Sequence, residues 1–310
     1  MTRRSFLTVA AVALLAPPAQ ARSPRALKID WWPSRAHVGD PALLRVGGTG
    51  EGARVEGSAG SRPVTFFRDA QEHAALIGFD LELRAGRQPW RVEVHEPGRD
   101  ARHARGTVHV LGRDFPVQRL TLPGAMVELD PKTEARALAE RDILQTLYRT
   151  ITPERLWRST FARPIPGSEA GSGFGARRIL NGRPRAPHAG TDYAAPRGTA
   201  VVAANDGRVA LVGDYFFQGR LVVVDHGLAL YTLYYHLDEV RVESDERVVR
   251  GQPLGTVGST GRATGPHLHF GAQVGAARVD PERLLTLLEA WGPRHGPAYP
   301  PNARTVPGNP

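Results

Sequence analysis

One stretch decides how the rest of the chain is interpreted: Gly258-Ser259-Thr260-Gly261-Arg262-Ala263-Thr264-Gly265-Pro266-His267-Leu268-His269-Phe270. A glycine-rich turn leads directly into two histidines at i and i+2, followed by an aromatic residue. In an extended strand, side chains at i and i+2 leave on the same face, so both imidazoles are expected to point at one spot. A metal ligand and a catalytic group can share such a spot. The pair alone is weak evidence, because histidines of surface strands have the same spacing.

Length and composition describe a globular protein of about two domains. The 310 residues are 41% hydrophobic and 23% charged, and 34 glycines and 26 prolines favour turns and strands over long helices. The formal net charge of +9 is carried almost entirely by arginine. This charge favours anionic partners such as the phospholipids or acidic glycans of a cell envelope, although an arginine-rich proteome would produce it too. Nucleic acid is not predicted as a partner, because the arginines are scattered and form no basic recognition helix.

Residues 1–21 have the pattern of a signal peptide. Arg3-Arg4 precedes an apolar run over residues 6–16, and Ala19-Gln20-Ala21 is a small-x-small cleavage site. The run is too short to span a bilayer, so we expect a periplasmic or otherwise extracytoplasmic protein without stable membrane insertion after cleavage. The two arginines fit a twin-arginine signal and an ordinary secretory signal equally well. The absence of cysteine restricts any metal site to His, Asp and Glu ligands.

Residues 27–112 show the alternation of half-buried strands. Trp90, Val92 and Val94 are expected to face a core, with charged residues between them facing outward. Turn signals separate the strands at intervals that suit a small immunoglobulin-like β-sandwich. We predict no site in this domain, because its histidines have no acidic or histidine partner at ligand spacing. These histidines are His37, His73, His95, His103 and His109.

Residues 113–160 are predicted to form a helical linker. Asp130-Pro131 is typical of an N-cap followed by proline at the first helical position. Apolar residues recur at heptad spacing from Ala137 to Ile151, which indicates one amphipathic helix over about residues 131–149. A second short helix is expected to start at Thr152-Pro153-Glu154.

Residues 161–291 are predicted to form an antiparallel β domain. Residues 199–212 have the pattern of a hairpin with an Asp-Gly turn, and residues 267–274 that of a strand. Other expected strands are 221–225, 228–235 and 248–258. A short helix over residues 281–291 closes the domain, and the tail over residues 292–310 is expected to be disordered. The fold class is therefore mainly β.

Four histidines of this domain lie beside turns or strand ends: His188, His236, His267 and His269. The first is followed four positions later by Asp192, and the intervening Gly190 favours a loop and a strand start over a helix face. One imidazole and one carboxylate are two of the three protein ligands that a catalytic zinc needs. A lone His-x-x-x-Asp pattern is common by chance, so its meaning depends on the other histidines.

Taken together, three motifs resemble the signature of the lysostaphin-type (LytM-like) zinc peptidases. They are His188-x-x-x-Asp192, His236-Leu237 and Gly265-Pro266-His267-Leu268-His269-Phe270, and the resemblance covers about residues 163–289. It implies a LytM-type peptidase domain that uses Zn²⁺ to hydrolyse peptide cross-links or stem peptides of peptidoglycan. It also implies the residue roles: His188, Asp192 and His269 as zinc ligands, and His236 and His267 as catalytic histidines.

The chemistry of these residue types agrees with the implied roles. Zinc held by two neutral imidazoles and one carboxylate keeps a positive charge, lowers the pKa of a bound water and polarises a carbonyl. No glutamate stands near the motifs to act as general base, so a histidine is expected to take the water proton while the second donates a hydrogen bond. Which of His236 and His267 does which stays open.

Two rival functions use the same features. The first is a non-hydrolytic envelope factor that binds and activates a cell-wall amidase. Such relatives typically lose zinc-binding or catalytic residues, whereas all five site residues are present here. The second is a bacteriocin-like enzyme that attacks other cells and is secreted beyond the envelope. For the peptidase and for the envelope factor, an envelope regulatory protein is an expected partner.

Overall fold

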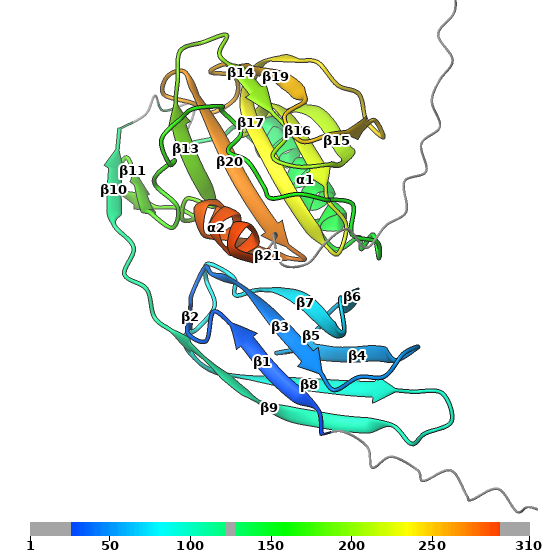
Figure 1. Ribbon diagram of the computed structural model, residues 1–310. Helices are drawn as coiled ribbons and strands as arrows, with labels where there is room; N and C mark the ends of the chain where they lie inside the picture. The colour runs from blue at the N-terminus through cyan, green and yellow to red at the C-terminus, as the bar shows by residue number, and fades with distance from the viewer. Residues whose placement is uncertain (1–25, 122–123, 125–127, 292–310) are drawn as a thin grey trace, which may run out of the picture.

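The computed structural model describes residues 26–121, 124 and 128–291, and it contains two β domains joined by a linking segment (Figure 1). The mainly β fold class is confirmed. The predicted signal peptide at 1–21 and the predicted tail at 292–310 lie outside the described residues. Within the described ranges, neither helix is long and apolar enough to cross a membrane.

The N-terminal domain is a sandwich of two sheets, with strand orders β1-β3-β7-β6 and β2-β9-β8-β4-β5. Val92 and Val94 of β8 are buried in a common core with Leu44 of β3 and Ile77 of β7, as the alternation predicts, and Trp90 packs partly buried against it. The strand bounds are β1 Lys28–Trp32, β2 Ala36–His37, β3 Pro41–Gly47, β4 Arg54–Ala59, β5 Arg62–Pro63, β6 Phe67–Asp69, β7 Glu72–Gly78, β8 Gly86–His95 and β9 Arg102–Leu111.

Three histidines of this domain do have an acidic neighbour, contrary to expectation. His37 Nδ1 lies 3.4 Å from Asp40 Oδ2, and the other two histidines share Glu93. Glu93 Oε1 lies 3.1 Å from His95 Nε2, and Glu93 Oε2 lies 3.7 Å from His103 Nδ1. The contact of Glu93 with His103 is a cross-strand pair between β8 and β9, which sequence spacing does not reveal. The side chains of Glu93, His95 and His103 are more than two-fifths exposed, and they are typical of a solvated sheet face.

The linker contains a strand as well as the predicted helix. β10 (Val117–Leu120) pairs in parallel with β11 (Arg177–Leu180), which continues to β12 (Arg183–Pro184). The helix α1 spans Pro131–Leu147, and the Asp130 side chain accepts hydrogen bonds from two backbone N–H groups of its first turn, as the N-cap prediction requires. The helix ends two residues before the predicted position. Ile151 therefore lies beyond the helix and is 45% exposed.

The second predicted linker helix is absent, since residues 151–160 have an irregular backbone. Their backbone groups bond elsewhere: the Leu228 N–H donates to Thr152 O at 2.7 Å, and the Leu156 N–H donates to His226 O at 2.9 Å. The Thr152 hydroxyl donates to Asp225 Oδ2 at 2.5 Å. These long-range bonds occupy the groups that a helix would use, so the local helix signal is overridden by tertiary contacts.

The C-terminal domain is built on one sheet with the strand order β13-β20-β17-β16-β15-β18, in which all neighbours are antiparallel as predicted. β14 pairs with β19, β19 also pairs with β17, and β21 pairs with β20. The bounds are β13 Gly190–Ala194, β14 Ala200–Val202, β15 Gly207–Tyr215, β16 Gly219–Asp225, β17 Leu230–Val240, β18 Arg247–Val248, β19 Pro253–Val257, β20 His267–Val274, β21 Ala277–Val279 and α2 Pro281–Trp291.

The hairpin predicted over residues 199–212 is wrong. β14 pairs with β19, and β15 pairs with β16 and β18, so the two halves of the expected hairpin are not neighbours. The Asn205 side chain is buried between them: its amide donates to Ser159 O at 2.7 Å, and its Oδ1 accepts from the Asp206 N–H at 2.8 Å. The predicted turn therefore joins β14 and β15, which pair with different strands.

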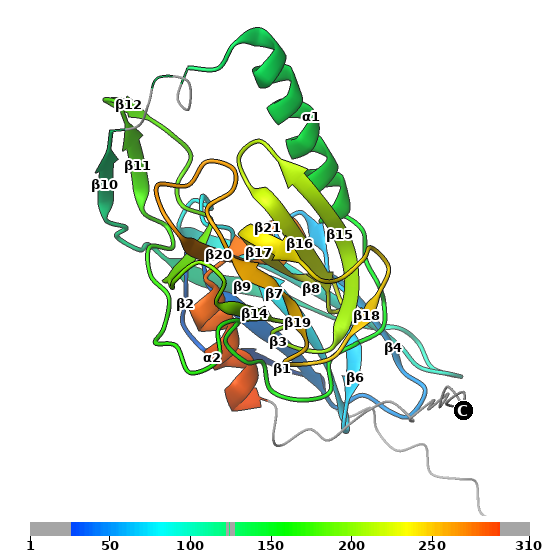
Figure 2. The same cartoon turned by 90° about the horizontal axis from the view of Figure 1, so that it is seen from above.

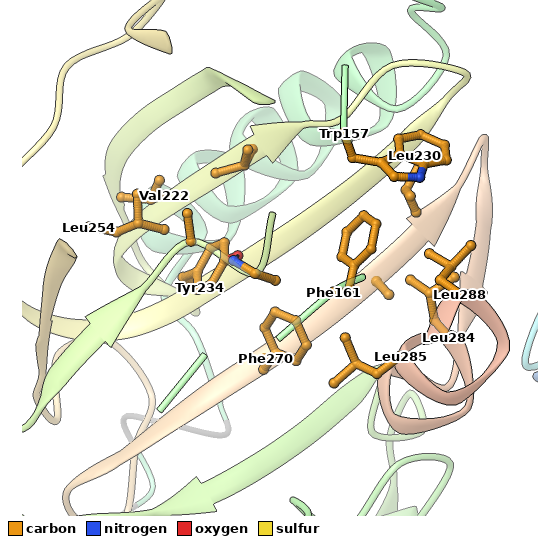
Figure 3. Packing of buried hydrophobic residues seen from close by; sticks show 14 of the residues in the cluster. Trp157, Phe161, Val222, Leu230, Tyr234, Leu254, Phe270, Leu284, Leu285 and Leu288 are labelled. Carbon is orange, nitrogen blue, oxygen red and sulfur yellow. The ribbon is translucent and has the colours of Figure 1, made fainter. Parts of the chain in front are cut away.

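The two faces of the main sheet are covered differently. α1 lies along one face, where Leu144 and the C-cap residue Tyr148 pack against Leu221 of β16 and Tyr231 of β17 (Figure 2). The opposite face carries the main core, in which linker aromatics, sheet residues and the apolar side of α2 meet (Figure 3). That core includes Trp157, Phe161, Val222, Tyr234, Phe270, Leu284, Leu285 and Leu288.

The two domains are docked through α2 and the strand before it. The Arg283 guanidinium donates to both carboxylate oxygens of Asp40 at 2.9 Å, and Arg113 Nη2 donates to Asp280 Oδ2 at 2.9 Å. Asp40 is 2% exposed, whereas the Arg283 side chain is 46% exposed, so the carboxylate of this pair is buried and the guanidinium reaches solvent. Leu43 of β3 belongs to the same buried cluster as the α2 leucines, which makes the domain contact part of the core.

Candidate metal centre

Three predicted ligands converge at the junction of β13 and β20. Asp192 on β13 and His269 on β20 are direct partners in the antiparallel register, so their side chains share one face. His188 lies in the loop before β13, where its Nδ1 contacts Gly173 O at 2.9 Å. A backbone carbonyl can only accept, so Nδ1 carries the proton and the Nε2 lone pair is free to bind a metal.

The donor atoms form a compact triangle. His188 Nε2 lies 2.8 Å from His269 Nδ1 and 3.0 Å from Asp192 Oδ1, and His269 Nδ1 lies 3.0 Å from Asp192 Oδ1. Within the described part of the chain, this is the one group of three or more His, Asp or Glu residues arranged to hold a metal ion. Two imidazole nitrogens and one carboxylate oxygen are the donor set of a catalytic zinc that keeps one coordination position open. The residues therefore fit the ion that the sequence predicts.

The electrostatics favour the metal-binding protonation states of Asp192 and His269. Burial by itself raises the pKa of Asp192, but its contacts with the His188 and His269 rings outweigh burial and hold this pKa far below its usual range. Burial lowers the pKa of His269 to about 4, although the Asp192 carboxylate opposes part of the effect. At neutral pH the carboxylate is therefore ionised and the His269 imidazole carries no net charge, which are the charge states that metal binding requires.

The two predicted catalytic histidines lie beside this triangle. The ring centroids of His236 and His267 are 4.8 Å apart, and His267 Nε2 is 3.8 Å from Asp192 Oδ1. His236 Nδ1 donates to Thr260 O at 2.8 Å and His267 Nδ1 donates to Gly265 O at 2.8 Å. In both rings the proton is therefore on Nδ1, and Nε2 has a lone pair that can accept a proton.

His236 reaches the site through an unusual backbone conformation. Its φ of +64° lies in the left-handed region, and the β16–β17 register shifts at this point. In a regular strand, Tyr235 and His236 would point to opposite faces. Here Tyr235 stacks on the ligand His269, with ring centroids 5.2 Å apart and planes 7° apart, while His236 approaches the same ring at 6.0 Å. The irregular residue thus brings adjacent side chains to one site.

A cavity of about 550 Å³ opens at the metal centre. His188, His236 and His269 line it from the main domain, and Glu134 and Leu138 of α1 line it from the linker. From the sequence, α1 was expected to link the two domains, and its position at the cleft was not predicted. Leu138 is 44% exposed and Ile143 of the same helix is 50% exposed, so the sequence pattern of α1 does not single out the residues at the cleft.

Other residues of the cleft also escaped the sequence reasoning, namely Arg178, Arg185 and Arg262. Tyr235 also lines the cavity, whereas Tyr193 and Tyr234 are buried in the core. Tyr193 donates to Glu282, and the Tyr234 hydroxyl accepts from the Ala204 N–H at 2.8 Å.

His226, which follows β16 and precedes Gly227, is a core histidine. It is completely buried, and its Nδ1 donates to Asp206 O at 2.8 Å while its Nε2 lies 2.7 Å from the Thr232 hydroxyl. Burial lowers its pKa to about 4, which keeps the ring neutral. Its role is to join β16, β17 and the turn before β15.

Comparison with known proteins supports this arrangement. Residues 186–281 match Peptidase family M23. The chain is 38% identical over 130 residues, 42% of its length, to the peptidoglycan DD-endopeptidase ShyA of Vibrio cholerae, and 40% identical over 139 residues, 44% of its length, to ShyC of the same organism. These matches cover 28% and 32% of the two relatives, so the chain spans less than a third of their length.

A solved structure extends the likeness beyond the matched domain. The crystal structure of an M23 peptidase candidate from Pseudomonas aeruginosa has a TM-score of 0.63 and 28% identity, over 81% of this chain and 95% of that one. The likeness therefore includes the N-terminal sandwich as well as the domain with the metal centre. These findings confirm the family-level resemblance, and they locate the match to peptidase family M23 in the C-terminal β domain of the chain.

Proposed function

We propose that the protein is a zinc-dependent endopeptidase that hydrolyses peptide cross-links or stem peptides of peptidoglycan outside the cytoplasm. The observation that carries the proposal is the convergence of three metal donor atoms within 3.0 Å of one another, beside two histidines whose Nδ1 protons are held by backbone carbonyls. The named activity of the ShyA and ShyC relatives supports the substrate class. An extracytoplasmic location follows from that substrate and from the predicted signal peptide.

In the proposed reaction, each residue has a role set by its geometry. His188, Asp192 and His269 would hold the zinc ion, which when bound polarises a peptide carbonyl and acidifies water. The Gly265 and Thr260 carbonyls fix the proton on Nδ1 of His267 and His236, so each Nε2 is available to take or return a proton. The pair can thus serve as the base for the water and as the acid for the leaving nitrogen.

Digestion of purified sacculi by the protein tests this proposal. The zinc-loaded protein is expected to release muropeptides, and chelator treatment, His236→Ala and His267→Ala are each expected to reduce the rate by at least about 100-fold. Arg177→Gln, on the exposed face of β11, is the matched surface control and should keep the wild-type rate. Mass spectrometry of the products identifies the bond that is cut.

The same assay separates the rival functions. No muropeptide release from the zinc-loaded protein, together with stimulation of a cell-wall amidase, would show the non-hydrolytic envelope factor instead. Release that is equal in the wild type and both histidine variants would place the chemistry outside this site.

A further inference from the structure

Three arginines from distant parts of the sequence surround the metal centre. Arg178 lies on β11, Arg185 follows β12, and Arg262 lies in the loop between β19 and β20. All three line the cavity that His188 and His269 also line. Three cations at one place repel one another, so a contribution to the stability of the fold does not explain why they lie together.

The charge of the cavity wall is strongly positive. Apart from its histidines, the lining contains four arginines, the fourth being Arg141 of α1, and one acidic residue, Glu134, which leaves an excess of three positive charges (4 − 1 = 3). Arg141 Nη2 contacts Asp142 at 3.1 Å on the helix surface, so the other three arginines and Glu134 leave an excess of two positive charges at the cleft (3 − 1 = 2). An excess of one sign of charge in a cleft favours a ligand of the opposite charge.

Arg178 retains unused hydrogen-bonding capacity in the cleft. Its Nη2 is 3.9 Å from Asp192 Oδ2, which is beyond hydrogen-bond distance. Its Nε is buried and has no hydrogen-bond partner among the described residues. Buried donors are normally paired, so an unpaired guanidinium N–H beside a cavity indicates that the partner belongs to a ligand.

Arg262 is held rigidly and has no acidic partner in the described part of the chain. Its guanidinium lies over the Phe217 ring, with Cζ 4.2 Å from the centroid, and its backbone N–H donates to Phe217 O at 3.1 Å. Burial, together with the nearby charges of Arg178 and Arg185, lowers the pKa of Arg262 to about 10. The side chain is therefore pre-positioned in an electropositive environment, which favours binding of an anion.

We propose that Arg178 and Arg262 form a carboxylate-binding subsite, which selects peptides with a free carboxylate next to the bond to be cut. This inference rests on the proposed peptidase function of the same cleft. A planar guanidinium pairs with a carboxylate through two parallel N–H donors, whereas a carboxamide presents one acceptor and a repelled NH₂ group. The subsite would orient the peptide chain relative to the metal centre and exclude amidated peptides.

Binding to metal-free protein tests the subsite without any hydrolysis. The probes are N-acetyl-D-alanyl-D-alanine and the same compound with a C-terminal carboxamide, titrated against chelator-treated protein and followed by NMR. The wild type is expected to bind the acid at least about 10-fold more tightly than the amide, the scale of one charge-assisted hydrogen bond. Arg262→Gln should abolish this preference, Arg262→Lys should retain part of it, and Arg177→Gln should leave it unchanged.

Hydrolysis by the zinc-loaded protein then separates this inference from the function on which it rests. On matched acid and amide peptides, Arg262→Gln is expected to lower kcat/KM for the acid by about 10-fold or more and to change the value for the amide little. Equal binding and equal cleavage of acid and amide by the wild type would overturn the subsite while the peptidase function stands. A carboxylate preference in binding without cleavage of either peptide would support the subsite and overturn the peptidase function.

Discussion

At the scale of single residues, the two histidines of the His-Leu-His segment have different surroundings. His269 Nδ1 lies in the donor triangle, whereas His267 donates its Nδ1 proton to Gly265 O and has only a 3.8 Å approach to Asp192. The strand places both rings on one face, and the different contacts of the two rings distinguish their functions.

This division predicts how the two alanine variants bind metal. His269→Ala is expected to lower zinc affinity by at least about 100-fold, because one of three protein ligands is lost, whereas His267→Ala should keep about one zinc per chain. Metal analysis after dialysis against a fixed free-zinc buffer measures the stoichiometry. Retention of zinc by His269→Ala and loss by His267→Ala would reverse the assignment.

A second prediction at this scale concerns the buried His226. Its pKa of about 4 in the folded protein is below the value of 6.5 expected for an exposed histidine. Above pH 6.5 the ring is neutral in both states and its contribution to stability is complete. As the pH falls from 6.5 to 4, the unfolded chain takes up the proton first, so about 3 kcal/mol of stability is lost.

Urea unfolding of metal-free protein between pH 7.5 and 4.5 measures this effect. His226→Gln is expected to be less stable at neutral pH and to show a pH dependence smaller by about 2 to 3 kcal/mol. His109→Gln, at an exposed position of β9, should behave like the wild type. An unchanged pH dependence in His226→Gln would show that this ring does not titrate on unfolding.

At the scale of elements, α1 is a part of the catalytic domain although it precedes it in sequence. Its C-cap residue Tyr148 places its hydroxyl 3.1 Å from that of Tyr235, which stacks on the ligand His269. Its outer surface lines the cavity through Glu134 and Leu138. The helix therefore supports the metal centre from behind and also forms one wall of the cleft.

Packing of α1 on the sheet can be tested with two leucines of the same helix. Leu144 is 5% exposed in the cluster with Leu221 and Tyr231, and Leu138 is 44% exposed. Leu144→Ala is expected to lower the free energy of unfolding by about 3 kcal/mol, and Leu138→Ala by less than about 0.5 kcal/mol. Chemical denaturation followed by circular dichroism measures both, and equally small losses would mean that the helix is not firmly docked.

At the scale of the whole molecule, the sandwich and the C-terminal domain contribute residues to one buried hydrophobic cluster. Leu43 and Leu76 of the sandwich lie in the cluster that contains Trp291 of α2. The Trp291 indole N–H donates to Asp69 Oδ2 at 3.2 Å across the same contact. With a common core, the two domains are expected to unfold in one cooperative transition.

The ion pair at this contact gives the test of the docking. Asp40→Asn removes a nearly buried charge opposite Arg283 and Arg113, so a loss of about 2 kcal/mol is expected. The exposed pair of Asp142 with Arg141 provides the control, because Asp142→Asn should change stability by less than about 0.5 kcal/mol. Scanning calorimetry that resolves two transitions in the wild type would contradict the shared core.

The sequence by itself determined several features that depend on local pattern. Alternation identified the sandwich strands, the Asp130-Pro131 signal located the start of α1, and the bounds of α2 agree with the structure. The motif around His267 and His269 indicated the family and the candidate ligands. These features are readable because side-chain direction within one element follows from its period, and capping residues act within one turn.

Only the tertiary structure decided which elements are neighbours. The expected hairpin failed because β14 pairs with β19, more than fifty positions away, and the helix expected at Thr152 gave way to bonds with the Leu228 and Asp225 segment. The approach of Arg178 to Arg262 has the same origin. Contacts of this kind depend on the free energy of packing distant segments together, which no local period or spacing records.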